Sequence, residues 1–301
     1  MKKNHSRTAT VQAEELRHSK VLDLAMLVKM RLTLLVVFSA LLAFLIVEEG
    51  GFSLLSFVIL ALGGFAITAA ANALNQALEK DYDKLMRRTE NRPVAAGRMS
   101  VSSAIMIGGV LFVVGIILLA FFNPLASVLG AAAVVLYAFL YTPMKRISPV
   151  SVFVGAIPGA LPAMIGVVAI EGSITPMAIV LFGIQFFWQF PHFWSIGYLG
   201  YEDYKRAGFR LVPESNGKIH PQIGMQSMLF ALLLLPFSLM PYVLDVVSIW
   251  SCILVAIMSL GYAIYGWNLY RKMTTEAARK LMFYSFLYLP VALFIYYLGS
   301  L

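Results

Sequence analysis

The stretch NALNQALEKDYDKLMRRTENRP, residues 72–93, ends an apolar run with amides and carboxylates, and arginines follow. The residues before it, from about 54 onward, are apolar enough to lie in lipid. Of the 301 residues, 60% are hydrophobic and 13% are charged, and the mean hydropathy is +0.82. Such a chain has too little polar surface to cover a soluble globule, so we expect an integral membrane protein. The single cysteine, Cys252, excludes an internal disulfide and any multi-cysteine metal site.

Nine stretches have the roughly 20 apolar residues that a helix needs to cross a hydrocarbon core about 30 Å thick. They lie near 32–47, 54–75, 101–121, 125–142, 150–170, 176–198, 222–244, 248–268 and 281–299. We therefore predict an all-α polytopic membrane protein, with an N-terminal segment over 1–31 and a single domain of nine transmembrane helices over 32–299. The polar N-terminal segment lacks an apolar core followed by a small-residue cleavage site, so no cleaved signal is expected.

The distribution of basic residues predicts the orientation. All 23 lysines and arginines fall in the N-terminal segment or in the connections 76–100, 143–149, 199–221 and 269–280, and the other four connections have none. Because cytoplasmic loops are enriched in basic residues, we predict a cytoplasmic N-terminus and, after nine spans, a C-terminus outside. This distribution matters more than the net charge of +8, and no nucleic-acid partner is expected.

Three polar residues at the end of the second span share one face of a helix. Asn75, Glu79 and Asp83 are spaced i, i+4, i+8, which is a drift of only about 80° at 3.6 residues per turn. Asp81 points to roughly the opposite side. Two carboxylates and an amide offer the hard oxygen ligands that suit Mg²⁺, which commonly bridges to substrate phosphates. We therefore expect Asn75, Glu79 and Asp83 to be the metal ligands.

Arginines follow these acids directly, at Arg87, Arg88 and Arg92. A guanidinium group matches phosphate oxygens with paired donors, so acids that hold a metal beside arginines that hold an anion suggest a diphosphate site. The alternative is simpler. A helix that leaves the membrane often carries mixed charge because it is solvated, and its basic residues can serve topology and lipid headgroups alone.

Two further cytoplasmic connections extend this pattern. In YEDYKRAGFRLVPE, residues 201–214, Asp203 precedes Lys205 and Arg206, so acid and base again stand together. This connection and the one at 76–100 could face one another across a bundle. Lys145 and Arg146 follow the fourth span, either as an anchor at the membrane surface or as part of the anion site.

The pattern Asn75-xxx-Glu79-xxx-Asp83, continuing into Arg88-Thr89-xx-Arg92-Pro93, resembles the first aspartate-rich motif of the UbiA-type intramembrane prenyltransferases. The stretches YTPMKRISPVSVFVGAIPGALPAMIG (141–166), FWQFPHFWSIGY (187–198) and DYKRAGFRLVP (203–213) are similar to the protohaem IX farnesyltransferase branch of that family, also called haem O synthases. The similarity extends from about residue 21 to 299.

The resemblance implies a nine-helix bundle around a lipid-accessible cavity and Mg²⁺-dependent transfer of a farnesyl group from farnesyl diphosphate to a vinyl group of haem B, giving haem O. It implies catalytic roles for Asn75, Glu79, Asp83 and Asp203, and diphosphate contacts from Arg88, Arg92, Lys145, Arg146, Lys205 and Arg206. Its expected partners are membrane lipid and haem A synthase or terminal-oxidase assembly proteins. A bacterial plasma membrane is favoured over a mitochondrial inner membrane.

Two positions depart from the family pattern. Glu79 stands where the first motif usually has aspartate, and Ala207 stands where the second motif commonly has a second aspartate, four residues after Asp203. The second motif therefore lacks one of its carboxylates. Asp203 can instead hold water or orient Lys205.

His192 is the only histidine deep in a predicted span. Gln185, Gln189 and His192 are related by roughly one-turn spacings, so a polar stripe enters the sixth span. His192 could make an interhelical hydrogen bond or bind haem, since imidazole is a common axial ligand of haem iron.

Two other functions remain open at this stage. A prenyltransferase that acts on an aromatic quinone precursor would share the diphosphate site and differ in its acceptor pocket. A transporter would place ionisable groups near the midplane of the membrane, whereas the acids here gather at the cytoplasmic ends of helices.

The predicted topology can be tested with reporter fusions. Fusions after Gly50, Asn123, Gly172, Asp245 and Leu301 should report the outside, and fusions near Gly97, Ser148, Gly217 and Thr275 the cytoplasm. One clear reversal would mean that the list of spans is wrong.

Overall fold

The computed structural model describes residues 20–48 and 50–301. Most of the N-terminal segment expected over 1–31 therefore lies outside the described residues. Within them the fold is helical, apart from one two-stranded antiparallel hairpin. The helices are α2 (Lys20–Leu27), α3 (Met30–Ile46), α4 (Leu54–Leu78), α5 (Lys80–Asp83), α6 (Val101–Ala120), α7 (Pro124–Val135), the π-helix η1 (Leu136–Tyr141), α8 (Thr142–Met144), α9 (Ser151–Glu171), α10 (Pro176–Leu199), α11 (Tyr201–Arg206), α12 (Gln222–Leu232), α13 (Leu234–Val243), α14 (Ile249–Lys272) and α15 (Thr275–Ser300), and the strands are β1 (Glu214–Ser215) and β2 (Lys218–Ile219).

Side-chain caps set the starts of most long helices. Ser53, Ser100, Asn123, Thr175, Ser248 and Thr274 each accept a hydrogen bond from a backbone N–H in the first turn that follows. Each cap satisfies a donor that the helix itself leaves unpaired. Pro124 and Pro176 stand at the first helical position, where a missing N–H costs nothing.

Seven helical segments of the described chain are long and apolar enough to cross a membrane, and the bent pair α2 and α3 would make an eighth. These eight coincide with eight of the predicted spans. The ninth, predicted at 176–198, is α10, which has 24 residues but contains Gln185, Gln189 and His192, and these lower its mean hydropathy. The prediction of an all-α multi-pass membrane protein is thus confirmed. By length and apolarity alone, the described helices give at most eight spans and not the nine predicted.

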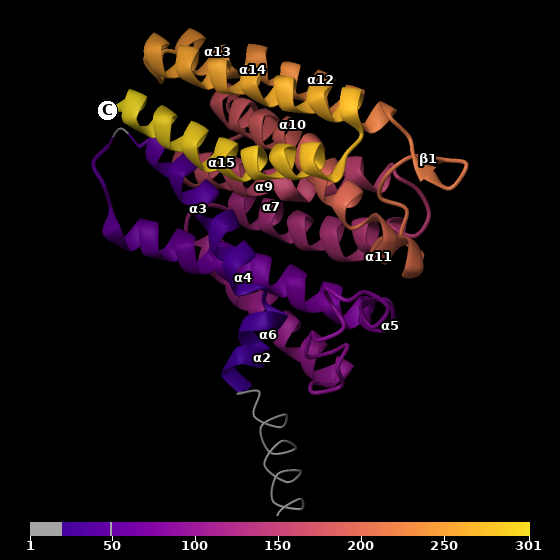
Figure 1. Cartoon of the computed structure of the whole chain (residues 1–301). Helices are drawn as coiled ribbons and strands as arrows, with labels where there is room; N and C mark the ends of the chain where they lie inside the picture. Colours follow the sequence, from indigo (N-terminus) through magenta and orange to yellow (C-terminus); the bar gives the residue numbers. More distant parts are fainter. Residues whose placement is uncertain (1–19, 49) are drawn as a thin grey trace, which may run out of the picture.

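The long helices lie side by side in a bundle, and α9 runs through its middle, packed against α3, α7 and α10 (Figure 1). The short helices α5 and α11 and the hairpin lie at one end of the bundle, and the C-terminus lies at the other (Figure 1). The two polar connections that the sequence singled out therefore meet at the same end.

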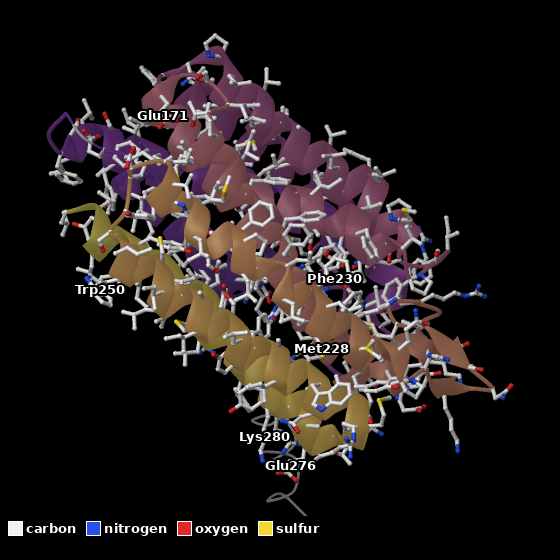
Figure 2. All side chains as sticks on the ribbon, turned by 90° about the horizontal axis from the view of Figure 1, so that it is seen from above. Glu171, Met228, Phe230, Trp250, Glu276 and Lys280 are labelled. Atoms are coloured by element: carbon white, nitrogen blue, oxygen red, sulfur yellow. The ribbon has the colours of Figure 1, made fainter. Side chains whose placement is uncertain are left out.

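Apolar side chains project outward along the length of the bundle (Figure 2). Trp250, for example, is 73% exposed, and large leucine, isoleucine, valine and phenylalanine side chains on most of the long helices are also exposed. The ion pair between Glu276 and Lys280, 2.7 Å apart, lies in the first turns of α15. An apolar belt with charges beyond it is the surface expected of helices in lipid.

Glycines of α9 allow its neighbours to approach closely. A Cβ added at Gly166 would lie 2.2 Å from the carbonyl oxygen of Ala40 on α3, and one at Gly159 would lie 2.0 Å from Oε1 of Gln189 on α10. Small residues at helix crossings are the usual means by which membrane helices pack tightly.

We expect Gly166→Ala to destabilise the protein by about 1–3 kcal/mol, because the added methyl group would overlap the α3 backbone. Gly109 on α6 offers a matched control, since nothing lies within 4 Å of a Cβ there and alanine has the higher helix propensity. Thermal unfolding in detergent, followed by circular dichroism, would measure both effects. Equal stability of the two variants would contradict the close packing of α3 and α9.

Candidate active site

The helical register of α4 continues through its junction with α5. The N–H of Glu79 donates to the carbonyl of Asn75 at 3.0 Å, and the N–H of Asp83 donates to the carbonyl of Glu79 at 2.8 Å. Asn75, Glu79 and Asp83 therefore lie on one face, as their spacing predicts, and are 1%, 4% and 1% exposed. The Asp81 side chain is 82% exposed and pairs with Lys84. The structure thus separates the three residues from Asp81.

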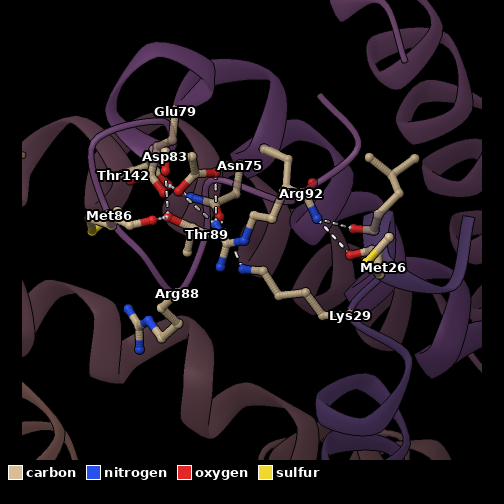
Figure 3. A network of polar contacts seen from close by, with 12 residues as sticks. Met26, Lys29, Asn75, Glu79, Asp83, Met86, Arg88, Thr89, Arg92 and Thr142 are labelled. Atoms are coloured by element: carbon tan, nitrogen blue, oxygen red, sulfur yellow. Dashed lines mark hydrogen bonds and ion pairs between the residues drawn. The ribbon is translucent and has the colours of Figure 1, made fainter. Parts of the chain in front are cut away.

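Each member of this face has a basic partner, and Figure 3 shows those of Asn75 and Asp83. Nη1 of Arg92 donates to both carboxylate oxygens of Asp83, at 2.9 and 2.8 Å. Glu79 forms an ion pair with Lys145. Nζ of Lys29 donates to Oδ1 of Asn75 at 3.0 Å.

Lys29 was not predicted as a site residue. It lies at the 49° bend between α2 and α3, and its backbone is in the left-handed region, with φ of 48°. Such a conformation is uncommon outside glycine, and it is often found at functional sites. The sequence does place a lysine shortly before the first apolar stretch. The positive-inside rule is enough to explain a lysine at that position, so it did not indicate a site residue.

Thr142 is a second residue that sequence reasoning missed. Its hydroxyl accepts a hydrogen bond from Nδ2 of Asn75 at 3.0 Å and donates to the carbonyl of Tyr137 at 2.9 Å. The π-helix η1 immediately precedes it, and such wide turns are frequent at functional sites. Asn75 is therefore held from both sides, by Lys29 through its oxygen and by Thr142 through its nitrogen.

The connection after α5 folds back over the acids. The hydroxyl of Thr89 donates to the backbone carbonyl of Asp83 at 2.8 Å, and this return brings Arg92 against the Asp83 side chain. Farther along, Arg98 forms an ion pair with Asp23 of α2 at 2.9 Å. Two ion pairs thus hold the connection after α5 in place, one to Asp83 of α5 and one to Asp23 of α2.

The second polar connection contacts the first, as expected. Nη2 of Arg88 donates to the phenol oxygen of Tyr204 at 2.6 Å, and the rings of Tyr82 and Phe209 are 5.8 Å apart. Arg88 points away from the network around Asp83 (Figure 3). Aromatic side chains, which the charge pattern did not identify, make these contacts.

Asp203, Lys205 and Arg206 lie outside the buried network. Asp203 pairs with Arg206 at 2.9 Å on the exposed side of α11, and the ammonium of Lys205 lies 5.5 Å from the centre of the Tyr201 ring. An acid and a base three residues apart on a helix neutralise each other locally. In this structure, therefore, Asp203, Lys205 and Arg206 have partners other than the three residues of the buried face.

The basic pair after η1 divides between the network and its edge. Lys145 is buried, with its ammonium 4.9 Å from the centre of the Tyr141 ring. Arg146 donates to the phenol oxygen of Tyr82 at 2.5 Å and lies 4.5 Å from the centre of that ring. Lys145 thus belongs to the buried network, and Arg146 lies on its periphery.

Burial and charge shape the chemistry of the network. Burial raises the pKa of the Asp83 carboxyl, and the charge of Arg92 opposes this shift. Burial also lowers the pKa of the Lys145 ammonium, and Glu79 opposes that shift. Lys29, Arg92 and Lys145 are three basic groups against the two carboxylates of Glu79 and Asp83, which gives the network a formal charge of +1.

The described residues contain no group of three His, Cys, Asp or Glu side chains that could hold a metal. The predicted set instead joins two carboxylates to the amide oxygen of Asn75, all hard ligands of the type that Mg²⁺ takes. Oε1 of Glu79 is sealed from solvent and meets Lys145 without hydrogen-bond geometry. The donor set therefore fits a hard divalent ion that also has ligands from outside the protein.

A cavity of about 730 Å³ adjoins the network inside the bundle. Asn72, Tyr137 and Tyr141 line its end nearest the network, and most of the remaining lining is apolar. Leu35 on α3 and Phe286 on α15 also line it, yet they are 59% and 47% exposed. The cavity wall therefore includes side chains that are also exposed on the apolar outside of the bundle.

His192 lines the same cavity. Its Nδ1 lies 2.8 Å from the hydroxyl oxygen of Ser285 on α15, and its ring stacks on Trp188 with 4.9 Å between ring centres. The glutamines of the predicted polar stripe are used between helices: Nε2 of Gln185 donates to the carbonyl of Gly159, and Nε2 of Gln189 donates to that of Ala156. The interhelical hydrogen bond considered for His192 is thus present, and the ring still faces the cavity.

The fold and the site thus define a membrane protein in which a network of bases and acids lies at the end of a mostly apolar cavity. Residues 36–288 match the UbiA prenyltransferase family, and the chain belongs to that family.

Its relatives include proteins named Protoheme IX farnesyltransferase. That of Cytophaga hutchinsonii is 38% identical over 266 residues, which are 88% of this chain and 93% of the relative. That of Christiangramia forsetii is 41% identical over 283 residues, which are 92% of this chain and 93% of the relative.

Solved structures share the fold at low sequence identity. A structure of digeranylgeranylglyceryl phosphate synthase has a TM-score of 0.78 and 18% identity, covering 93% of this chain and 98% of that one. A UbiA homologue from Archaeoglobus fulgidus, bound to GPP and Mg²⁺, has a TM-score of 0.64 and 16% identity, covering 91% of this chain and 99% of that one. The family assignment and the all-helical fold therefore agree.

Proposed function

We propose that this protein transfers the farnesyl group of farnesyl diphosphate to a vinyl group of haem B, giving haem O and diphosphate. The observation that carries this proposal is the identity of 38% and 41% to proteins named Protoheme IX farnesyltransferase over nearly their whole length. The polar network and the adjoining cavity support it, because together they suit a substrate with an anionic head and an apolar chain.

The diphosphate would bind at the polar network. Arg92 and Lys145 neutralise Asp83 and Glu79 in the protein alone, and both would turn toward phosphate oxygens once a divalent ion took over the carboxylates. Lys29 also belongs to the network, because its ammonium donates a hydrogen bond to the side chain of Asn75. Arg88 of the connection 76–100 and Arg146 of the connection 143–149 lie at the edge of the network, and both would turn toward the outer phosphate.

Asn75, Glu79 and Asp83 would hold Mg²⁺. The metal would supply charge neutralisation of the leaving diphosphate. The A. fulgidus homologue holds GPP and Mg²⁺ on the same fold, which supports metal dependence here. Asp203 pairs with Arg206, so we assign it a supporting role at the entrance and no metal contact.

The reaction begins when the bond between the farnesyl carbon and oxygen breaks and its electron pair leaves with diphosphate. Basic side chains that are already in place stabilise this developing charge, and they do so more strongly away from water. The π electrons of the haem vinyl group then form the new carbon–carbon bond. Water adds to the resulting cation and loses a proton, which gives the hydroxyethylfarnesyl group.

The cavity would protect the allylic cation until the vinyl group attacks. Its lining is mostly apolar, and the rings of Tyr137, Tyr141 and Trp188 border it. Aromatic faces stabilise a nearby cation, and exclusion of water prevents simple hydrolysis. His192, in the same lining, would contact the haem iron.

We also propose a single domain of nine spans with a cytoplasmic N-terminus and an external C-terminus, in a bacterial plasma membrane. The distribution of lysine and arginine supports this topology, as does the position of α5 and α11 at one end of the bundle (Figure 1). Haem A synthase and terminal-oxidase assembly proteins are the proposed partners.

The direct test is to incubate the purified protein with haem B, farnesyl diphosphate and Mg²⁺ and to look for haem O by mass. Omission of Mg²⁺ should abolish the product. An aromatic quinone precursor offered in place of haem B should give no product. Its prenylation, with haem B unchanged, would overturn the proposal in favour of the other acceptor class.

Glu79→Gln and Asp83→Asn should each lower kcat by about 100-fold or more, because each replaces a carboxylate ligand of Mg²⁺, the ion that would neutralise the departing diphosphate, with a neutral amide of the same shape. Amides are preferred to alanine here because both acids are buried and paired with cations. Asp81→Asn is the matched control, and its turnover should be nearly that of the unmodified protein. Equal losses in all three variants would contradict the assignment to one helical face.

Arg92→Lys and His192→Ala should separate the two substrates. Arg92→Lys keeps a charge beside Asp83 but loses the paired donors, so affinity for a non-reactive farnesyl diphosphate analogue should fall about 10-fold, with haem affinity unchanged. His192→Ala should weaken haem binding and leave the analogue affinity unchanged, since the two groups lie in different parts of the site. Loss of both affinities in either variant would count against two distinct subsites.

A further inference from the structure

Ser285 of α15 makes two contacts with α10. Its hydroxyl oxygen lies 2.8 Å from Nδ1 of His192, and its backbone carbonyl accepts a hydrogen bond from the indole N–H of Trp188 at 2.8 Å. Ser285 is fully buried and does not line the cavity, whereas Trp188 and His192 both do. One residue behind the cavity wall thus holds two rings of that wall.

The contacts of the Ser285 hydroxyl favour one of the two tautomers of His192. A serine hydroxyl has a single proton to donate. The carbonyl of Met282 is the nearest acceptor for this proton, 2.5 Å from the hydroxyl oxygen. With the proton directed to that carbonyl, the hydroxyl oxygen accepts from Nδ1 of His192 at 2.8 Å, and Nδ1 carries the hydrogen of the neutral imidazole.

The other ring nitrogen, Nε2, is left as an acceptor. In the part of the chain that the structure describes, Nε2 has no hydrogen-bond partner, and it is not among the unpartnered atoms sealed from solvent. Since the ring lines the cavity, this lone pair is accessible from the cavity. Stacking on Trp188, with 18° between the ring planes, fixes the plane in which the lone pair points.

We propose that Ser285 is a positioning residue that holds His192 as the Nδ1-protonated tautomer, so that Nε2 is presented to the iron of the haem substrate. The part of this inference that names haem as the ligand rests on the proposed function. The part that concerns the tautomer does not. A hydrogen bond to the second nitrogen is the usual way in which proteins orient a metal-binding imidazole and raise its basicity. The carbonyl of Ser285 adds to this by fixing Trp188, against which the imidazole lies.

The tautomer can be measured without any haem. In full-length protein labelled with ¹⁵N-histidine, the His192 signal, assigned by its absence in His192→Gln, should show a protonated Nδ1 and an unprotonated Nε2 at a pH at which the ring is neutral. Ser285→Ala should shift this signal toward the other tautomer, and Ser285→Thr, which keeps the hydroxyl, should restore it. A protonated Nε2 in the unmodified protein, or no shift in Ser285→Ala, would overturn the inference.

Haem binding gives the second measurement. Titration of ferric haem B into detergent-solubilised protein without farnesyl diphosphate should give the absorption spectrum of an imidazole-ligated haem, which His192→Ala should lose. Ser285→Ala should raise the Kd about 10-fold, the effect typical of losing the partner that orients a metal ligand. Ser285→Thr should return the Kd to that of the unmodified protein.

Two further variants separate positioning from general packing. Ser259 is the matched control because it is equally buried, and its hydroxyl also bonds an aromatic side chain, Tyr288, at 2.7 Å, away from the cavity. Ser259→Ala should leave the Kd and the spectrum unchanged. The double variant His192→Ala with Ser285→Ala should bind haem no more weakly than His192→Ala alone, and additive losses would contradict action through His192.

The failures of the two proposals are distinguishable. If the unmodified protein binds no haem but His192 has the expected tautomer, the proposed function fails and the role of Ser285 in setting the tautomer stands. If the unmodified protein binds haem and Ser285→Ala changes neither the tautomer nor the spectrum, the role of Ser285 fails and the proposed function stands.

Discussion

The buried carboxylates of Glu79 and Asp83 at the end of α4 and α5 are the constraint on which the polar end of the molecule depends. A charge removed from water is costly unless it is paired, and losing one partner of a buried pair is more costly than never burying the pair. Asp83 is therefore met by Arg92, which requires the connection after α5 to fold back. Glu79 is met by Lys145, which brings the end of the fourth span against the second. The cations that pair with these carboxylates, Arg92 and Lys145, belong to the residue types that also bind phosphate.

The interior of the bundle follows a different rule, which is close approach of helix backbones. Gly159 and Gly166 let α9 press against α10 and α3, and the glutamines of α10 donate to carbonyls of α9. Where the helices diverge, the cavity remains, with His192 and Trp188 in its wall. Part of the cavity wall, including Leu35 and Phe286, is also exposed on the outside of the bundle.

Several features of the site were predictable because they depend on helical periodicity or on short-range chemistry. The common face of Asn75, Glu79 and Asp83 and the exclusion of Asp81 are both local and are present in the structure. Lys29 and Thr142 were missed because they reach Asn75 from 46 and 67 residues away. Lys205 and Arg206 were expected at the anion site, but local pairing on α11 keeps Arg206 with Asp203. Charge alone did not indicate that Tyr204, between these charged residues, would make the contact with Arg88.

The sequence by itself determined that the chain is an all-α membrane protein, which helices carry the polar faces, and at which end the charges gather, because hydropathy and periodicity are properties of consecutive residues. Only the tertiary structure decided which base pairs with which acid, that η1 and the bend at Lys29 complete the network, and that Ser285 supports His192 from behind. These contacts join residues on different helices. Their geometry depends on how the helices pack, and packing is set by side-chain shape across the whole bundle.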